Sequence, residues 1–264
     1  SVNSCLPVDM DLDGTDEMLA FTIETGDSVS ASATLYKYSA DGRETLGRTR
    51  LDGHISYYSE IKAQENDGRV YIYADAVKSS GTQMLTEVIY WSDYYNTIIS
   101  PFYSYSTGVT SSTSRNSMIN CTDIDADGVI EIPVDAEVPD LPSDVYAVEW
   151  TKYDSSVLTS ACYSLAVIKD EYQIMIPDEY IDEIKVLYSS EESGLTVTDK
   201  NDETLFSVFC VLKAHYVENT SAYSQYSLIA ESSGYLYFAQ TGESGQDDFS
   251  ADALKSMIRT NEGE

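Results

Sequence analysis

Short runs of strand-forming residues, separated by turn-forming ones, fill most of residues 18–176. The runs are rich in Tyr, Ile, Val and Thr, whose side chains suit a pleated, half-buried surface. They cover residues 18–24, 33–38, 55–63, 70–77, 85–91, 145–153 and 161–168. Asp41-Gly42 and Asp67-Gly68 lie between runs, where an Asp-Gly pair favours a tight hairpin turn with positive φ. Because this part shows no helical period of 3.6 residues, it predicts antiparallel sheet.

The last third of the chain combines predicted strands with a predicted helix. Further strands are predicted over residues 172–176, 184–188, 195–198, 205–213 and 234–240. Ser250 has the position of a helix N-cap, and Leu254, Met257 and Ile258 share one face of the helix that would follow and pack on the sheet. We therefore expect a mainly β protein with a β-repeat part over residues 1–170 and a small α+β domain over residues 171–264. Residues 104–117 and 135–144 are predicted to be exposed connections.

The charge of the chain excludes several classes of partner. Its 45 Asp and Glu against 15 Lys and Arg give a net charge of −30, which repels nucleic acid and anionic membrane surfaces. A hydrophobic fraction of 42% argues against disorder despite that charge. No run of 18 apolar residues exists, so no transmembrane segment is expected, and residues 1–10 lack the features of a signal peptide.

The four cysteines, Cys5, Cys121, Cys162 and Cys210, are far apart and form no C-x-x-C pair. This spacing excludes a zinc ribbon and a thioredoxin-like motif. It leaves open two disulfides, in any of three connectivities, or four separate thiols. The two histidines are too few and too separated to indicate a zinc site.

A nine-residue pattern, D-x-D-x-D-G-x-x-E, occurs twice, each time before apolar residues that begin a strand. The first copy contains Asp9, Asp11, Asp13, Thr15 and Glu17, and the second contains Asp123, Asp125, Asp127, Val129 and Glu131. Alternating Asp residues let three carboxylates converge, and the glycine permits a sharp turn between them. The Glu and a backbone carbonyl at the seventh position would complete a shell of oxygen ligands. Such a hard, negative ligand set predicts one or two structural Ca²⁺ ions.

The position of the glutamate distinguishes these loops from an EF-hand. An EF-hand places its bidentate Glu at the twelfth position, where this chain has Ala20 and Val134. A Glu at the ninth position leads directly into a strand and indicates a calcium loop of a β-hairpin. The alternative is that each loop is an ordinary acidic turn that arose by chance in an acidic chain. Two copies in the same position before a strand are harder to explain by chance than one.

A third, degenerate copy lies between the other two, over residues 63–72. It keeps Asp67-Gly68 and the following strand but loses ligands. The aspartates before the glycines, Asp13, Asp67 and Asp127, are 54 and 60 residues apart. Multi-strand repeats of roughly this length are typical of β-propeller blades, so about three blade-like units are expected.

These loops resemble the FG-GAP/VCBS-type repeats of calcium-binding β-propellers. In that family the first, third, fifth and ninth loop residues bind Ca²⁺ through their side chains. The resemblance therefore assigns this role to Asp9, Asp11, Asp13 and Glu17, and to Asp123, Asp125, Asp127 and Glu131. The Phe-Gly and Gly-Ala-Pro signatures of the family are missing. Three blades cannot close a ring, so the resemblance implies either a fragment or an open stack of sheets.

The tail from about Gln173 resembles a module of surface lipoproteins from Gram-positive gut bacteria. This resemblance implies an extracellular or cell-surface location, with lipid anchoring through a segment upstream of this chain. Millimolar calcium outside the cell suits low-affinity loops.

Other motifs carry less information. Ser59-Glu-Ile-Lys62 matches the S-x-x-K nucleophile motif, but that motif requires a helix where a strand is predicted here. Paired tyrosines at residues 57–58, 94–95 and 103–105 are typical either of cross-strand ladders or of an aromatic platform for carbohydrate.

We expect a non-enzymatic, surface-exposed binding or structural module with calcium-stabilised β repeats, whose partner is a protein or a carbohydrate. The alternative is a secreted hydrolase of glycans or peptidoglycan, for which the sequence offers no specific constellation of residues.

Overall fold

The computed structural model describes residues 2–25, 29–154, 157–218, 220–245 and 248–260. It is mainly β, with 55% of residues in strands and 9% in helices, and its strands form several antiparallel sheets. The predicted fold class is therefore confirmed at this level. No closed barrel occurs among the described residues.

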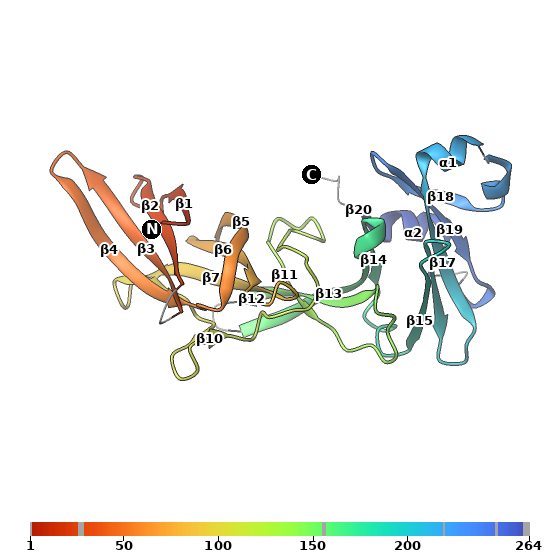
Figure 1. The fold of residues 1–264 in the computed structure, drawn as a ribbon, viewed down its shortest axis with the longest axis horizontal. Helices are drawn as coiled ribbons and strands as arrows, with labels where there is room; N and C mark the ends of the chain where they lie inside the picture. Colours follow the sequence, from red (N-terminus) through yellow and green to blue (C-terminus); the bar gives the residue numbers. More distant parts are fainter. Residues whose placement is uncertain (1, 26–28, 155–156, 219, 246–247, 261–264) are drawn as a thin grey trace. The chain divides into compact units, whose positions relative to one another are not determined.

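The first two sheets are four-stranded meanders in which each strand pairs with its neighbour in sequence (Figure 1). The first sheet contains β1 (Ser4–Val8), β2 (Glu17–Glu24), β3 (Ser30–Ser39) and β4 (Gly42–Leu51), and the second contains β5 (Ile55–Asn66), β6 (Arg69–Lys78), β7 (Met84–Ser92) and β8 (Thr97–Ile99). All of these pairings are antiparallel. Consecutive hairpins keep the pairing local, as in a blade-like sheet.

Asp67-Gly68 forms a hairpin turn, as predicted, whereas at Asp41-Gly42 only the aspartate lies in the turn and Gly42 begins β4. Asn66 pairs with Arg69, and Asp67 and Gly68 between them have φ of 49° and 70°, which is the geometry of a type I′ turn. The degenerate third copy of the loop pattern is therefore a plain hairpin turn. At the other site Ser39 pairs with Gly42.

The two central strands of the β5–β8 sheet, β6 and β7, are buried on both faces. One face shares a core with the β1–β4 sheet, in which Leu19 and Phe21 lie in one cluster with Ile72 and Leu85. The opposite face of β6 and β7 contributes a second cluster of Tyr and Val side chains, which includes Ile132. Double burial explains why eight of the ten residues of β6 are buried, and why β6 reads as a nearly continuous run rather than an alternating one.

Ten further strands form two five-stranded sheets. Their orders are β11-β12-β13-β14-β20 and β15-β16-β17-β19-β18. The first comprises β11 (Ile132–Asp135), β12 (Tyr146–Asp154), β13 (Val157–Val167), β14 (Tyr172–Ile176) and β20 (Ile258–Thr260); the second comprises β15 (Ile184–Ser189), β16 (Gly194–Asp199), β17 (Thr204–Leu212), β18 (Ser227–Glu231) and β19 (Tyr235–Thr241). A small hairpin pairs β9 (Tyr103–Ser104) with β10 (Val109–Thr110). Short helices are α1 (Lys213–Glu218), α2 (Ala251–Met257), η1 (Ile168–Asp170), η2 (Thr220–Tyr223) and η3 (Glu243–Gly245).

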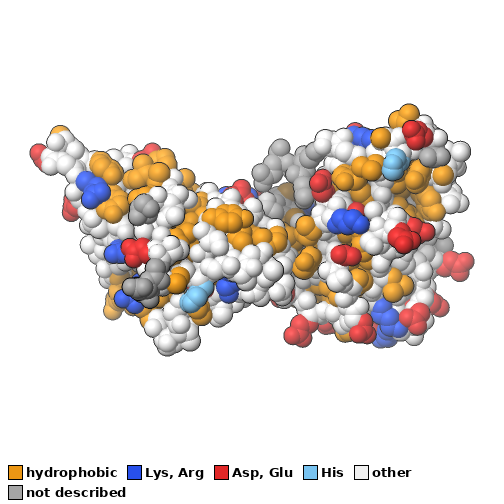
Figure 2. Space-filling view, in the orientation of Figure 1, with side chains coloured by type: hydrophobic (Ala, Val, Ile, Leu, Met, Phe, Trp, Pro, Cys, Tyr) orange, Lys and Arg blue, Asp and Glu red, His pale blue; other side chains and the backbone are white. Residues whose placement is uncertain are grey.

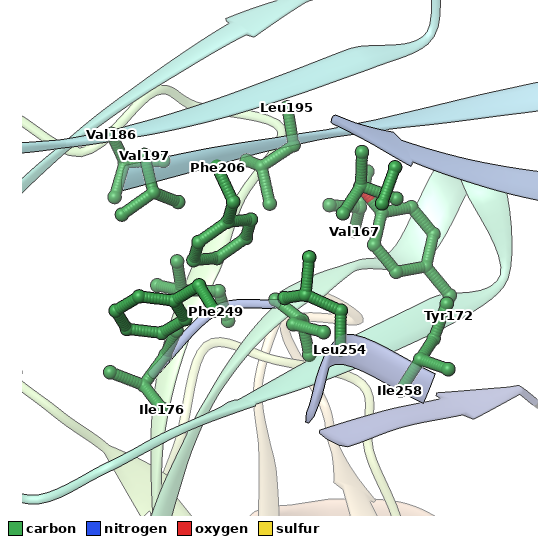
Figure 3. Close-up of a cluster of buried hydrophobic side chains, with 14 of the residues drawn as sticks. Val167, Tyr172, Ile176, Val186, Leu195, Val197, Phe206, Phe249, Leu254 and Ile258 are labelled. Carbon is green, nitrogen blue, oxygen red and sulfur yellow. The ribbon is translucent and has the colours of Figure 1, made fainter. Parts of the chain in front are cut away.

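The chain divides into two compact units. The first contains residues 1–134 and 151–160, and the second contains residues 135–150 and 161–264. The boundary expected at residue 170 lies inside the second unit. In the core of that unit, the rings of Phe206 and Phe249 have centroids 4.9 Å apart (Figure 3).

The C-terminal helix begins as predicted. Ser250 is its N-cap, and the Ser250 hydroxyl accepts a hydrogen bond from the amide of Ala253. Leu254 lies in the core of the second unit, so the helix packs on the sheet as expected. Ile258 does not belong to the helix, however, because it is the first residue of β20.

Three strands of the first unit, β1, β4 and the three-residue β8, and one segment differ from the sequence-based expectation. The strands β1 and β4 were not predicted, because Pro7 and the polar residues of GRETLGRTRL hide their strand character. Residues 104–117 are not a solvated loop: Thr110, Thr113 and Arg115 are buried. These residues are buried through polar contacts. A prediction of burial from the pattern of apolar residues cannot detect such contacts.

No disulfide bond joins the four cysteines, all of which the structure describes. Cys121 and Cys210 are buried, Cys162 is half-buried and Cys5 is exposed. Burial raises the pKa of the Cys121 thiol well above its usual value and that of Cys210 to about 12. Both therefore behave as small core side chains rather than as reactive thiolates.

Strand β7, which is buried on both faces, also contains Glu87, which has no exposed surface. Its carboxyl group accepts hydrogen bonds from the amide of Asp52 (2.7 Å) and from the hydroxyls of Thr110 (3.0 and 3.1 Å) and Ser100 (3.2 Å). Burial outweighs these hydrogen bonds and raises the pKa of Glu87 to about 7.

We predict that Glu87 makes the protein less stable as the pH rises from about 4.5 to about 7. The folded state holds the Glu87 proton more tightly than the unfolded state does. The stabilisation by this proton is therefore complete below the pKa of the unfolded state, and it is lost as the pH rises through the pKa of the folded state. The loss is on the order of 3 kcal/mol. Urea unfolding of Glu87→Gln at pH 5 and pH 8 should show a smaller pH dependence than the wild-type chain. Equal pH dependence in both proteins would contradict this assignment.

Candidate metal loops

The first acidic loop connects β1 to β2 and is held by its own backbone amides. The Asp9 carboxylate accepts hydrogen bonds from the amides of Asp13 (3.0 Å) and Gly14 (2.8 Å). Asp11 accepts a further bond from the amide of Asp13 (3.2 Å), and Asp13 accepts one from the amide of Thr15 (2.9 Å). These contacts wrap the chain around its aspartates and fix where their oxygens lie.

The second loop, between Thr122 and β11, repeats this arrangement. The Asp123 carboxylate accepts hydrogen bonds from the amides of Asp127 (3.0 Å) and Gly128 (2.9 Å). Asp125 accepts one from the amide of Asp127 (3.1 Å), and Asp127 accepts one from the amide of Val129 (2.9 Å). Every hydrogen bond of the first loop therefore has a counterpart here.

The backbones of the loops agree as closely as their hydrogen bonds. Leu12 and Ala126 have φ of 58° and 62°, and Gly14 and Gly128 both have φ of 87°. A positive φ of this size is readily adopted by glycine and strained for other residues, which explains the glycine at the sixth position. The repeated sequence pattern thus folds into the same loop twice.

The ninth-position glutamates have one carboxylate oxygen that makes no hydrogen bond. Glu17 and Glu131 are 1% and 0% exposed. One oxygen of each accepts a bond from a loop amide, that of Met10 (3.1 Å) or Ile124 (2.8 Å). The other oxygen, Oε1, is buried and has no hydrogen-bond partner. Burial raises the pKa of Glu17, and that of Glu131 to about 7.

Each glutamate also offers an oxygen that converges with those of the aspartates. One oxygen from each member of a set lies within 4.8 Å of every other; the sets are Asp123, Asp125, Asp127 and Glu131 in the second loop, and Asp9, Asp11 and Glu17 in the first. A converging set of carboxylate oxygens fits a hard divalent cation such as Ca²⁺. Asp13 lies outside the first set. The structure shows Thr15 and Val129 only as amide donors, and their carbonyls remain predicted ligands.

A lysine that the sequence analysis did not identify reaches into each loop. In the first loop the Lys37 ammonium contacts Asp13 Oδ2 and lies 3.2 Å from Glu17 Oε1. In the second, the Lys152 ammonium contacts Asp127 Oδ2 and lies 3.1 Å from Asp125 Oδ2 and 3.3 Å from Glu131 Oε1. Each lysine is therefore the cation nearest to a glutamate oxygen that makes no hydrogen bond.

The two lysines occupy equivalent positions. Met18 pairs with Tyr36, and one further step along β2 and β3 places Lys37 opposite Glu17. The amide of Ala136 donates to the carbonyl of Ala147, and the same register counted back along the strands places Lys152 opposite Glu131. A lysine opposite the last residue of each acidic pattern is a signal that strand pairing reveals and linear spacing does not.

The ion pairs alter the protonation of both partners. The hydrogen bond from Lys37 lowers the pKa of Asp13, and that from Lys152 lowers the pKa of Asp127. Asp13, followed by Glu17, raises the pKa of Lys37. Partial burial opposes the charged form of Lys152, but contacts with Asp127, Asp125 and Glu131 outweigh it and raise its pKa. Both lysines are therefore permanent cations near neutral pH.

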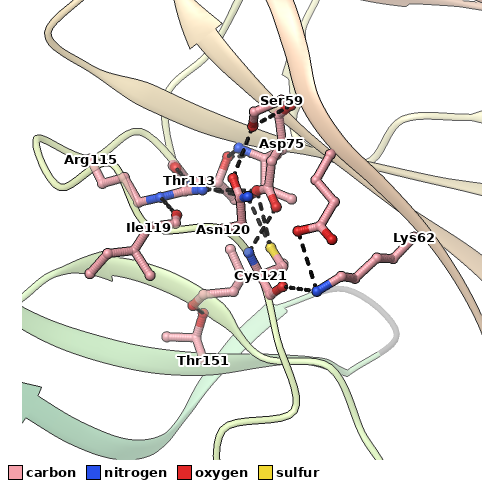
Figure 4. Close-up of polar contacts among 12 residues, drawn as sticks. Ser59, Lys62, Asp75, Thr113, Arg115, Ile119, Asn120, Cys121 and Thr151 are labelled. Carbon is pink, nitrogen blue, oxygen red and sulfur yellow. Dashed lines mark hydrogen bonds and ion pairs between the residues drawn. The ribbon is translucent and has the colours of Figure 1, made fainter. Parts of the chain in front are cut away.

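A buried ion pair anchors the chain just before the second loop (Figure 4). Arg115 Nη2 donates to Asp75 Oδ1 at 2.8 Å, and neither side chain is more than 2% exposed. The other Asp75 oxygen accepts the amide of Cys121 at 2.8 Å. Lys62 Nζ donates to the carbonyl of Cys121 at 2.9 Å. The loop therefore begins from a point fixed to β5 and β6.

A glutamine fastens the far side of the same loop. Gln64 Nε2 donates to the carbonyl of Gly128 at 2.8 Å, and Gln64 Oε1 accepts the amide of Ile130 at 2.9 Å. Gln64 belongs to the degenerate third copy of the pattern, on β5. That copy provides no cation loop of its own but positions the second one.

Ser59 and Lys62, the S-x-x-K pair, have structural contacts. The Ser59 hydroxyl donates to the Asn120 side chain at 2.9 Å and to the Asp75 carbonyl at 3.3 Å. Both residues lie on β5, a strand, which is not the context that the nucleophile motif requires.

The tyrosine pairs do not share one environment. Tyr58 packs on Phe21 with ring centroids 4.9 Å apart, whereas Tyr94 and Tyr95 are exposed and in contact with each other. Tyr103 and Tyr105 are in T-shaped contact, with centroids 5.1 Å apart. Tyr58 is therefore a core residue and belongs to no exposed platform.

Comparison with known proteins assigns no family to the chain. No protein-family model matches it, and no curated protein is similar to it in sequence. The resemblance to FG-GAP/VCBS repeats and that to bacterial surface lipoproteins therefore remain predictions.

We predict that Arg115→Met destabilises the protein by about 3–5 kcal/mol, because it leaves the Asp75 charge buried without its partner. The double variant Asp75→Asn/Arg115→Met should be less unstable than the single one, since it removes the unpaired charge as well. Urea unfolding of the three proteins measures both effects. A single variant that loses less than about 1 kcal/mol would show that the pair is dispensable.

Proposed function

We propose that the chain is a non-enzymatic, surface-exposed binding or structural module whose β repeats are stabilised by calcium in the two acidic loops. The observation that supports it best is the convergence of carboxylate oxygens in both loops, where each set includes a buried glutamate, Glu17 or Glu131, whose Oε1 makes no hydrogen bond. A buried oxygen of this kind is costly unless a cation or donor compensates it. In each loop one lysine ammonium faces this oxygen, at 3.2 Å for Glu17 and 3.3 Å for Glu131, so a single positive charge stands against at least three carboxylates.

The proposed role of calcium is structural because of where the glutamates lie. Glu17 is the first residue of β2, and Glu131 directly precedes β11. A cation held between such a glutamate and the preceding aspartates would fix the entry to a strand. It would also reduce the repulsion among the loop carboxylates, so its binding free energy would add to the stability of the fold.

The proposed partner is a protein or a carbohydrate rather than a nucleic acid or a membrane. Acidic side chains are scattered over the visible face, singly or in small groups, with apolar side chains between them (Figure 2). No helix in the described ranges is long and apolar enough to cross a membrane. We propose a location outside the cytoplasm, where millimolar calcium suits loops of this type.

The alternative is a hydrolase of glycans or peptidoglycan, and it requires carboxylates that a substrate can reach. Glu87, whose pKa lies near neutrality, and its neighbour Asp52 have no exposed surface. This pair therefore gives no support to the alternative. Reproducible turnover of a glycan or peptide substrate, lost on replacing one carboxylate, would favour the hydrolase instead.

We predict that calcium raises the melting temperature of the full chain. At ten times its Kd, an ion bound to the folded state alone adds about 1.4 kcal/mol per site. Two such sites would raise the Tm by roughly 6 °C or more. Asp11→Ala/Asp125→Ala should abolish most of this shift, because each change removes a member of a converging set.

Asp93→Ala/Asp178→Ala is the matched control, since it removes the same charge from two exposed positions outside both loops. Scanning calorimetry with calcium and with chelator compares the three proteins. An equal calcium response in the loop variant and the wild-type chain would show that the loops are not the sites.

A further inference from the structure

We propose that Lys37 and Lys152 are built-in counter-ions of the two loops, and that calcium binds by displacing their ammonium groups. This inference rests on the proposed calcium binding and concerns its regulation. Each ammonium occupies the region where a divalent cation would lie, against carboxylate oxygens of the predicted ligand set.

The same placement is found in two loops that belong to different sheets. In each, the lysine extends from the neighbouring strand, opposite the ninth-position glutamate, and its ammonium approaches both that glutamate and the fifth-position aspartate. The chain has three times as many acidic as basic residues, yet each loop has one lysine in this position. A chance contact of a surface lysine would not be expected to recur with the same partners.

Calcium and the ammonium cannot occupy the loop together. Ca²⁺ binds carboxylate oxygens at about 2.3–2.6 Å. The Lys152 ammonium lies 3.1 Å from Asp125 Oδ2 and 3.3 Å from Glu131 Oε1, so an ion bound to the same oxygens would lie in close contact with it. Two cations at that separation repel strongly in a partly buried site. Binding is therefore an exchange of one cation for another.

The lysines can leave without disturbing the core. Their side chains are 28% and 25% exposed, whereas those of Glu17 and Glu131 have no exposed surface. A lysine side chain has four carbon atoms between its backbone and its ammonium, and it can turn toward water at modest cost. The buried glutamates would keep their places while the lysine moves.

This exchange has two consequences for the loops. Without metal, the ammonium compensates part of the carboxylate repulsion, so the loop can fold in the absence of calcium. With metal, its displacement costs free energy that weakens calcium binding. Lys152 contacts three carboxylates and Lys37 contacts two, so we expect Lys152 to oppose calcium more strongly than Lys37 does.

The test is calcium titration of the full chain by isothermal calorimetry, with the variants Lys37→Met and Lys152→Met. Each should bind calcium at least tenfold more tightly at the altered loop, with the larger change for Lys152→Met. Lys200→Met is the matched control, because it removes an exposed lysine whose partner, Glu183, lies in neither loop. Its calcium affinity should equal that of the wild-type chain.

The outcomes separate this inference from the proposed function. Unchanged or weaker calcium binding in both loop variants would overturn the exchange while leaving calcium binding intact. Binding in the variants but not in the wild-type chain would support the exchange and contradict the proposed function. An absence of binding in all four proteins would overturn both.

Thermal unfolding in chelator covers the case of a variant that is too unstable to titrate. Removing the lysine should lower the Tm without calcium and enlarge the rise on adding it. A variant that is unfolded in chelator and folds with calcium supports the exchange. A variant that stays unfolded in calcium contradicts it.

Discussion

Burial of strands β6 and β7 on both faces is the constraint on which the rest of the first unit depends. A sheet covered on both sides leaves no solvent for the polar groups it carries, so each must find a partner within the protein. Asp75 and Glu87, on β6 and β7, meet this requirement in different ways. Asp75 has a buried arginine, whereas Glu87 has only neutral donors and a raised pKa. Both accept hydrogen bonds from residues between 100 and 121, which explains why Thr110 and Arg115 are buried.

The acidic loops meet a related constraint at the entry to strands. A glutamate that begins or precedes a strand places one oxygen on a backbone amide and leaves the other facing the aspartates. Backbone amides hold the aspartates, so the loop cannot relax by moving its carboxylates apart. Relief must come from a positive charge, and the neighbouring strand supplies a lysine. The loop and the strand pairing thus form one electrostatic unit.

Local patterns predicted much of the fold. The strands from β2 to β7, apart from β4, follow from runs of Tyr, Ile and Val, and the hairpin turn at Asp67-Gly68 follows from its need for positive φ. Such features depend on residues close together in sequence. The polar strand β4 was missed, because its place in the sheet is set by β3 rather than by its own residues.

The candidate sites show the same difference between features set by neighbouring residues in sequence and features set by contacts between strands. The loop carboxylates could be identified because nine consecutive residues contain them. Lys37 and Lys152 could not, because their approach depends on the register between strands. The buried role of Arg115 was hidden as well, because a Ser/Thr-rich segment resembles a solvated loop until its hydroxyls are seen to bond the sheet. Contacts that cross between elements carry the information that a linear reading lacks.

Gln64 shows what the decay of a repeat can leave behind. The middle copy has lost its acidic ligands, yet its glutamine holds the backbone of a loop 64 residues further along the chain. The conformation of the second loop therefore depends on the neighbouring strand β5 as well as on the sequence of the loop. A synthetic peptide of residues 123–131 would contain every carboxylate but lack the side chain that shapes its exit. The motif is consequently not portable, and grafting it onto another scaffold would require the glutamine-bearing strand as well.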